Sequence, residues 1–437
     1  MKIGMIAMSG IRVCDEELLR LGLTLPGFVE RSKTIASLPS LGLLTLAGMT
    51  PKKHEVEYIE VPDIKALDTL PDGFDLIAIS SYSAQIDEAY ELARRYKEAG
   101  TPVVLGGPHV TCLPEEAAAY CDSVVIGEGE ASWPGLLEDV ESASLKPFYG
   151  SADESFDMAD APMPALELLD ISKYNRLTVQ TSRGCPHRCE FCASSVLLSG
   201  KYKQKPMRKV LAEIDRILEI WQHPFIEFAD DNTFVDRKYW KKLLSELKNR
   251  KFKWFTETDI SVSEDDELLE LMCDRGCAQV LIGLESPVET GLDGLELRSN
   301  WKLNRWSQYK EAIRKIQSHG ITVNGCFIIG LDGQGPEIFE QVYEFVKDAE
   351  LYEVQVTIQT AFPGTPLYDR LKREGRIQRD RDWKKCTLFD VNYLPKNMSP
   401  QELAEGFQNL VVRLYSDEFT KWRRGNFKKF LRERGAK

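Results

Sequence analysis

The chain has 437 residues, of which 43% are hydrophobic and 28% are charged, and its formal net charge is −12. This length allows two or three domains with separate cores, and the composition excludes a disordered or fibrous protein. The acidic balance argues against general binding of nucleic acid.

The first part of the chain, 1–147, alternates β-rich runs with helical patterns. This alternation is typical of a parallel sheet covered by helices on both faces. Ile86, Ala89, Tyr90 and Ala93 recur at helical spacing and predict a crossover helix. We expect a five-stranded, doubly wound, Rossmann-like domain with strands at 2–8, 55–61, 75–80, 102–106 and 122–126.

Two segments of this region read as connections. The stretch 10–39 is longer than an ordinary connection, which favours a functional loop or a lid. Residues 148–174 are acidic, contain prolines and show no periodicity, which predicts a linker.

A second series of strands and helices occupies 175–375. Six repeats predict a partial (β/α)6 TIM-like barrel with its chemistry at the C-terminal strand ends. Ser399, Pro400 and Glu402 form a capping-box pattern inside a helical C-terminal extension at 376–437. The barrel strands are expected at 177–181, 225–229, 253–258, 279–283, 322–329 and 353–360.

Three cysteines, Cys185, Cys189 and Cys192, follow the first of these strands in the segment TSRGCPHRCEFC. Three thiolates on one short loop can bind one [4Fe-4S] cluster and leave its fourth iron without a protein ligand. S-adenosylmethionine can chelate that iron, so that one electron cleaves it to a 5′-deoxyadenosyl radical. A structural zinc site is the alternative, but zinc normally takes four ligands and no second ligand pair lies nearby.

This motif resembles that of the radical S-adenosylmethionine (radical SAM) superfamily, which has an aromatic residue before the third cysteine, as Phe191 is here. The resemblance implies a site for S-adenosylmethionine on later strand ends, where carboxylates suit ammonium and hydroxyl groups. One of the paired aspartates could instead cap the following helix. The implied binding residues are Phe191, Asp230, Asp231, Glu285, Ser286 and Gly330.

The order of domains resembles the cobalamin-binding subgroup of this superfamily. The carrying segments are GGPHVT at 106–111, GEGE at 127–130 and FPGTPLY at 362–368. Glycines at adjacent strand ends allow close approach of a corrin or its nucleotide tail. The resemblance therefore implies a cobalamin site that includes Ser80, Ser81, Gly106, Gly107, Gly127 and Glu128.

One feature departs from cobalamin domains of the methionine-synthase type, which carry a cobalt-binding histidine after the first strand. Here the stretch 7–13 reads AMSGIRV and has no histidine. Either cobalamin binds without a protein histidine or the domain has kept the fold and lost the cofactor. His109 is interpreted as part of the loop structure rather than as a cobalt ligand.

These features predict a radical SAM enzyme that is a cobalamin-dependent methyltransferase acting on an unactivated carbon. The alternative is a radical cyclase, ring-contraction or rearrangement enzyme without methyl transfer, with or without cobalamin. No catalytic acid or base is assigned.

The expected partners are a small-molecule or lipid-like substrate and an electron donor such as flavodoxin or ferredoxin. No apolar run approaches the length of a membrane span and no signal peptide is recognised, so a cytoplasmic protein is expected.

Overall fold

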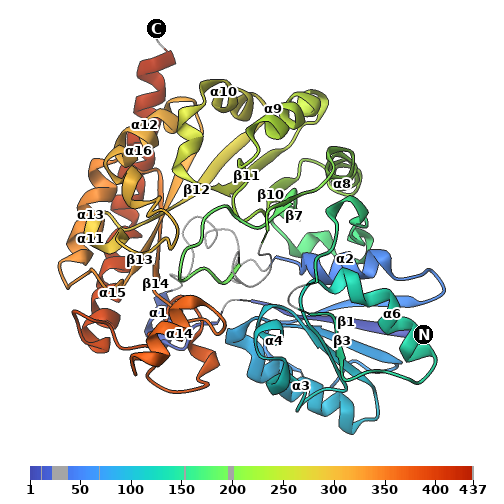
Figure 1. The fold of residues 1–437 in the computed structure, drawn as a ribbon. Coiled ribbons are helices and arrows are strands. Elements are labelled where there is room, and N and C mark those ends of the chain that lie inside the picture. Colours follow the sequence, from blue (N-terminus) through green and yellow to red (C-terminus); the bar gives the residue numbers. More distant parts are fainter. Residues whose placement is uncertain (11, 22–37, 68, 152–153, 195–200, 436–437) are drawn as a thin grey trace.

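The computed structural model describes residues 1–437 except 11, 22–37, 68, 152–153, 195–200 and 436–437. Two parallel six-stranded sheets lie side by side, and helices cover them (Figure 1). Most of the connection predicted at 10–39 lies outside the described residues. No helix in the described part of the chain is long and apolar enough to cross a bilayer.

The first sheet has the strand order β2-β1-β3-β4-β5-β6. Alternate side chains of β1 enter different cores: Ile3 and Met5 pack on one face, and Ile6 and Met8 on the other. This is the doubly wound arrangement that the sequence predicts. The strands are β1 (Lys2–Met8), β2 (Glu55–Val61), β3 (Leu76–Ser80), β4 (Val103–Gly106), β5 (Ser123–Val125) and β6 (Phe148–Tyr149).

The sixth strand, β6, corrects the expectation of five. Val125 pairs with Tyr149, so the start of the predicted linker joins the sheet edge. Two residues are too short to give a period-two pattern, which explains why the sequence did not indicate a strand. The helices of this region are α1 (Glu16–Leu21), α2 (Leu41–Met49), α3 (Ile86–Glu98), α4 (Pro108–Cys112), α5 (Pro114–Ala117) and α6 (Gly129–Glu141).

The second sheet has the order β14-β13-β12-β11-β10-β7, so consecutive strands are neighbours. No pairing links β14 with β7 in this sheet, which makes it the predicted partial barrel. A short antiparallel pair, β8 (Ser182–Arg183) and β9 (Lys203–Gln204), follows β7. The six strands are β7 (Leu177–Val179), β10 (Phe225–Phe228), β11 (Lys253–Thr258), β12 (Cys277–Glu285), β13 (Thr322–Ile329) and β14 (Glu353–Ile358).

Helices cover the outside of this barrel. The apolar face of α8 buries Val210, Ile214 and Ile217 against the sheet. The barrel helices are α8 (Met207–Ile220), α9 (Arg237–Glu246), α10 (Asp266–Asp274), α11 (Glu289–Leu292), α12 (Tyr309–Ser318), α13 (Ile338–Asp348) and α14 (Pro366–Arg373).

The C-terminal extension contains α15 (Pro400–Leu414) and α16 (Asp417–Gly435). Both hydrogen bonds of the predicted capping box between Ser399 and Glu402 are present. The extension also reaches the first domain, because the Trp383 indole donates to Glu116 at 3.0 Å and the Gln408 amide donates to Asp15 at 2.7 Å. It therefore ties the two sheets together.

Candidate active site

The three cysteines of the motif lie on the loop that follows β8, at the C-terminal end of the barrel. Burial raises the pKa of Cys189 to about 12, and the thiols of Cys192 and Cys185 are near enough to raise it further. Burial also raises the pKa of Cys185 to about 11. The loop thus gathers three thiols, and a metal bound there would favour their thiolate forms.

Both aspartates after β10 hold the start of this loop. Asp230 is 2% exposed, and its carboxylate accepts hydrogen bonds from the backbone N–H groups of Thr181 and Ser182 at 2.7 and 2.9 Å. Asp231 accepts from the Gly184 N–H at 2.7 Å and also binds Ser194. Asp230 anchors the loop, because buried backbone donors require acceptors. A contact of these carboxylates with S-adenosylmethionine stays a prediction.

The other side of the loop is held by Glu296. This buried carboxylate accepts from the backbone N–H of Arg188 at 3.0 Å and of Ser299 at 2.7 Å. Glu190, also on the loop, forms a bidentate ion pair with Arg370 of α14 at 3.0 and 2.6 Å. The sequence contains no signal for the Glu296–Arg188 and Glu190–Arg370 contacts, since these partners are 108 and 180 residues apart.

Glu285, predicted from the family motif, lies beside Cys189. Its carboxylate and the Gly283 carbonyl both accept from the Lys302 ammonium at 2.7 Å. The positive charge of Lys302 lowers the pKa of the Cys189 thiol, and the negative charge of Glu285 raises it. Glu285 has φ of 62° at a register shift of β12. A non-glycine residue in this conformation stores strain, and such strain is common at functional sites.

Two other residues that the sequence predicts to bind S-adenosylmethionine are buried. Ser286 is fully buried, and its hydroxyl bonds to the Val288 N–H and the Gln334 amide at 3.3 Å. Gly330 has φ of 95°, and a Cβ there would lie 2.3 Å from the Tyr393 hydroxyl, so packing explains this glycine. Both residues therefore have structural contacts, and their contact with S-adenosylmethionine stays a prediction. Phe191 is half-buried and packs against the core.

The loop that carries the three cysteines, called the cluster loop below, has side chains that suit an iron–sulfur cluster. It offers three thiols. The His187 ring on the same loop is hydrogen-bonded to Asp259 at 3.2 Å and packs at a tilt against Trp301. No three histidine, cysteine, aspartate or glutamate side chains in the described ranges are close enough to share a single metal ion. A cubane is larger, because each of its thiolates binds a different iron.

The inner side of the barrel carries acidic groups that the sequence motifs did not single out. Glu227 on β10 is buried and forms an ion pair with Arg176 at 2.5 Å. Glu257 on β11 has an exposed side chain, yet desolvation is the main cause that raises its pKa to about 7, and the charges of Glu227 and Asp231 add to it.

The C-terminal edge of the first sheet contains the residues predicted to bind the corrin. Ser81 is buried and donates to the Tyr82 carbonyl at 3.0 Å, whereas Ser80 is half-buried. A Cβ at Gly107 would lie 2.9 Å from the Ser81 carbonyl oxygen, so the packing of adjacent strand ends requires this glycine. At Gly106 the nearest atom would be 3.8 Å away, which leaves room.

The GEGE segment joins the two domains. Glu128 accepts from Arg183 at 2.7 Å and from the Phe156 N–H at 2.8 Å, and it also pairs with Lys203. Glu130 forms a second ion pair with the same arginine. The carboxylate of Glu128 therefore links the two domains, and its contact with the corrin stays a prediction. Gly127 donates its N–H to the Thr111 hydroxyl at 3.0 Å.

His109 is part of the loop structure, as the sequence analysis proposed. It is 1% exposed, with Nδ1 at 2.9 Å from the Ser83 hydroxyl and Nε2 at 3.4 Å from the Glu116 carboxylate. Burial lowers its pKa. Its ring also packs in a T-shaped arrangement with Trp383, and the two ring centroids are 5.2 Å apart.

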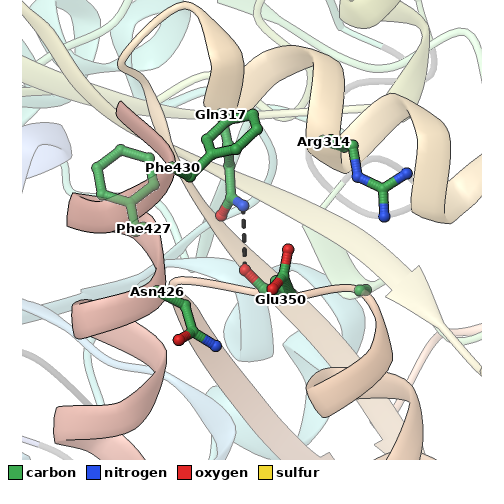
Figure 2. A pocket seen from close by; sticks show the side chains of 7 residues that line it. Arg314, Gln317, Glu350, Asn426, Phe427 and Phe430 are labelled. Carbon is green, nitrogen blue, oxygen red and sulfur yellow. Dashed lines mark hydrogen bonds between the residues drawn. The ribbon is translucent and has the colours of Figure 1, made fainter. Parts of the chain in front are cut away.

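A separate small pocket lies between α12 and α16 (Figure 2). There the Gln317 amide donates to the Glu350 carbonyl at 3.0 Å. Glu350 precedes β14, so this pocket is at the opposite end of the barrel from the cysteines and is not the candidate site.

Comparison with known proteins agrees with this arrangement. Residues 179–346 match the model of the radical SAM superfamily, and 33–137 match the B12 binding domain. An uncharacterized methyltransferase of Synechocystis is 30% identical over 86% of this chain and 71% of its own length. The chain belongs to the radical SAM superfamily. Residues 365–434 match a domain of unknown function.

Other relatives of this radical SAM enzyme have names that specify a reaction. Bacteriochlorophyllide d C-12(1)-methyltransferase of Chlorobaculum tepidum is 28% identical over 86% of this chain and 82% of its own. Hopanoid C-2 methylase of Rhodopseudomonas palustris is 31% identical over 79% of this chain and 66% of its own. The solved structure of the methyltransferase TsrM from Kitasatospora setae has a TM-score of 0.66 at 13% identity and covers 100% of both chains, which shows a shared fold.

Proposed function

We propose that this radical SAM enzyme is a cobalamin-dependent methyltransferase that acts on an unactivated carbon. The observation that carries the proposal is the ion pair of Arg183 with Glu128. Arg183 stands two residues before Cys185, and Glu128 follows β5, so the pair brings the C-terminal edges of both sheets together. Such edges are where α/β folds bind their ligands.

Each cofactor has residues suited to it. Cys185, Cys189 and Cys192 would hold the [4Fe-4S] cluster, and Glu285 with Lys302 beside Cys189 would meet S-adenosylmethionine. The edge of the first sheet at Ser80 and Gly106 would take the corrin. The cluster would supply the electron that generates a 5′-deoxyadenosyl radical, and cobalamin would carry the methyl group.

The relatives support methyl transfer over the alternative. Those most similar in the comparison include the methyltransferases named above. An anaerobic magnesium-protoporphyrin IX monomethyl ester cyclase of Cereibacter sphaeroides is also related, at 27% identity over 71% of this chain and 55% of its own. The experiment must therefore separate methyl transfer from radical cyclisation.

The distinguishing products arise from S-adenosylmethionine itself. We expect reconstituted protein with hydroxocobalamin, titanium(III) citrate and methyl-deuterated S-adenosylmethionine to release S-adenosylhomocysteine only when cobalamin is present. Cys192→Ala protein should keep this release and lose 5′-deoxyadenosine, because only the second product needs the cluster. Formation of 5′-deoxyadenosine without S-adenosylhomocysteine would favour the cyclase alternative.

The remaining assignments complete the proposal. The cobalamin-type domain spans 1–147, the linker 148–174, the radical SAM barrel 175–375 and the extension 376–437. The substrate is a small or lipid-like molecule, the reductant is a flavodoxin or ferredoxin, and the enzyme is cytoplasmic. Fractionation of cells and reduction of the purified protein by each donor test the last two assignments.

A further inference from the structure

The last helix, α16, carries a strongly basic stretch. Residues 419–432 contain six lysines and arginines and no acidic residue, whereas the whole chain has a net charge of −12. The positive charge here is therefore a local feature of one helix. It lies on the outside of the barrel, and the last turns of α16 extend past the neighbouring helices (Figure 1).

Two of the six cations are used inside the protein. Arg423 is buried and donates to the Tyr352 carbonyl at 2.9 Å and to the Glu353 carboxylate at 3.1 Å. Arg424 pairs with the other oxygen of Glu353 at 3.2 Å. These contacts, together with the buried ring of Phe427, fix the side of α16 that faces the barrel.

The other four cations point away from the barrel. Lys421, Lys428, Lys429 and Arg432 are all exposed, and we call these four residues the basic face. Lys421, Lys428 and Arg432 follow each other by seven and four residues, which places them on one side of a helix, and Lys429 borders them. The side chains of Lys421 and Lys429 are 80% and 77% exposed, and the acidic residue one turn away from each is 3.8 and 4.0 Å distant. Such long, exposed pairs leave the positive charge available to a partner.

An exposed tryptophan lies at the edge of the basic face. Trp422 is 38% exposed and precedes Lys429 by two helical turns. One side of its ring stacks on Phe419, with the centroids 5.4 Å apart and the planes 8° apart. Lysines and arginines beside a tryptophan are typical of helices that lie in the headgroup layer of a membrane.

The position of α16 restricts the kind of partner. Glu353, which holds Arg423 and Arg424, is the first residue of β14, so α16 is attached at the end of the barrel opposite the cysteines. A protein that delivers electrons must approach the cluster and would not bind at this end. A partner that carries many negative charges on a broad surface suits the basic face better.

We propose that the basic face of α16 binds the anionic headgroups of a membrane surface, with Trp422 in the headgroup layer. This proposal goes beyond the proposed function and does not rest on it. Phospholipid phosphates attract lysine and arginine over about one Debye length, roughly 8–10 Å at ordinary salt concentrations. A helix with this many charges lies on the membrane rather than across it.

Cosedimentation of the full-length, reconstituted protein with vesicles tests the proposal without turnover. We expect binding to vesicles of phosphatidylglycerol and phosphatidylcholine in equal parts, no binding to phosphatidylcholine alone, and release at high salt. The combined variant Lys428→Gln, Lys429→Gln and Arg432→Gln should weaken binding about a hundredfold, since each cation near an anionic surface contributes about fivefold. Trp422→Ala should also weaken binding but leave its salt dependence unchanged.

The matched control removes the same charge elsewhere. Lys238, Lys242 and Lys248 are exposed lysines on α9 and just after it, and their combined change to glutamine should leave vesicle binding as in the wild type. Thermal melting by circular dichroism compares the stability of the two combined variants. If the α16 variant is unstable, Lys428→Gln alone should still lose about fivefold in affinity.

Three results would overturn the proposal. The first is a wild type that binds no anionic vesicles or binds phosphatidylcholine equally well. The second is an equal loss of binding in the two combined variants, which would reflect net charge rather than the basic face. The third is equally tight binding of single-stranded RNA that only the α16 variant loses, which would assign this face to nucleic acid. None of these results bears on methyl transfer, so failure here leaves the proposed function unchanged.

Discussion

Arg183 and Glu128, which are 55 residues apart in the chain, form a 2.7 Å ion pair that joins the cluster loop to the first domain. Their side chains are only 18% and 9% exposed. Glu130 binds the same guanidinium group, so one arginine holds two acidic residues of the GEGE segment. The distance between the two cofactor regions depends on this cluster of charges.

Arg183→Ala should destabilise the protein, because it removes the arginine partner of two largely buried carboxylates, and only Glu128 keeps a second cation, Lys203. Breaking a buried pair costs roughly 3–5 kcal/mol, and the partial exposure puts the expected loss near the lower end. Urea denaturation of the metal-free protein measures it. Arg216→Ala, which removes an exposed pair with Glu219, is the control and should change stability by less than about 0.5 kcal/mol. Equal losses in both variants would contradict the role of Arg183.

Cysteine variants should divide into two groups. Cys185→Ala, Cys189→Ala and Cys192→Ala should each lose the bound iron and the formation of 5′-deoxyadenosine, since a cubane cluster needs all three thiolates. Corrin binding should remain. Cys273→Ala, an exposed cysteine, should keep iron content and activity. The iron and sulfide content of each variant is measured after anaerobic reconstitution. Full iron content in Cys185→Ala would refute the ligand assignment.

Asp230→Ala should affect the loop rather than the affinity for S-adenosylmethionine. The variant leaves the buried N–H groups of Thr181 and Ser182 without an acceptor, at a cost of about 1–3 kcal/mol for each such group. We expect lower stability in urea and faster iron release during dialysis. A variant with normal stability and iron but weak S-adenosylmethionine binding would contradict this loop-anchoring role and support the ammonium-binding role that the sequence predicts.

Glu257 should make stability depend on pH. Its folded pKa of about 7 lies above the usual glutamate value of 4.5, so the folded state holds a proton that the unfolded state has already lost. The wild type should therefore lose stability relative to Glu257→Gln as pH rises from 5 to 7. Denaturation of the metal-free proteins across this range measures the difference, and parallel curves for the two proteins would contradict the assignment.

Local patterns in the amino-acid sequence were enough to predict the architecture and the metal-binding loop. The period of the apolar residues predicted the long strands and helices within a few residues, because burial of one face dictates that period. The spacing of Cys185, Cys189 and Cys192 is local and needs no partner elsewhere in the chain. The capping box at Ser399 is local in the same way.

The assembly of the site could not be predicted from local patterns, because it depends on contacts between distant parts of the chain. Asp230 and Glu128 carried the right chemistry in the sequence, but the backbone and arginine groups that occupy them lie about 50 residues away. The Glu190–Arg370 pair spans 180 residues. Such pairings depend on how distant parts of the chain pack together, and no local pattern encodes them.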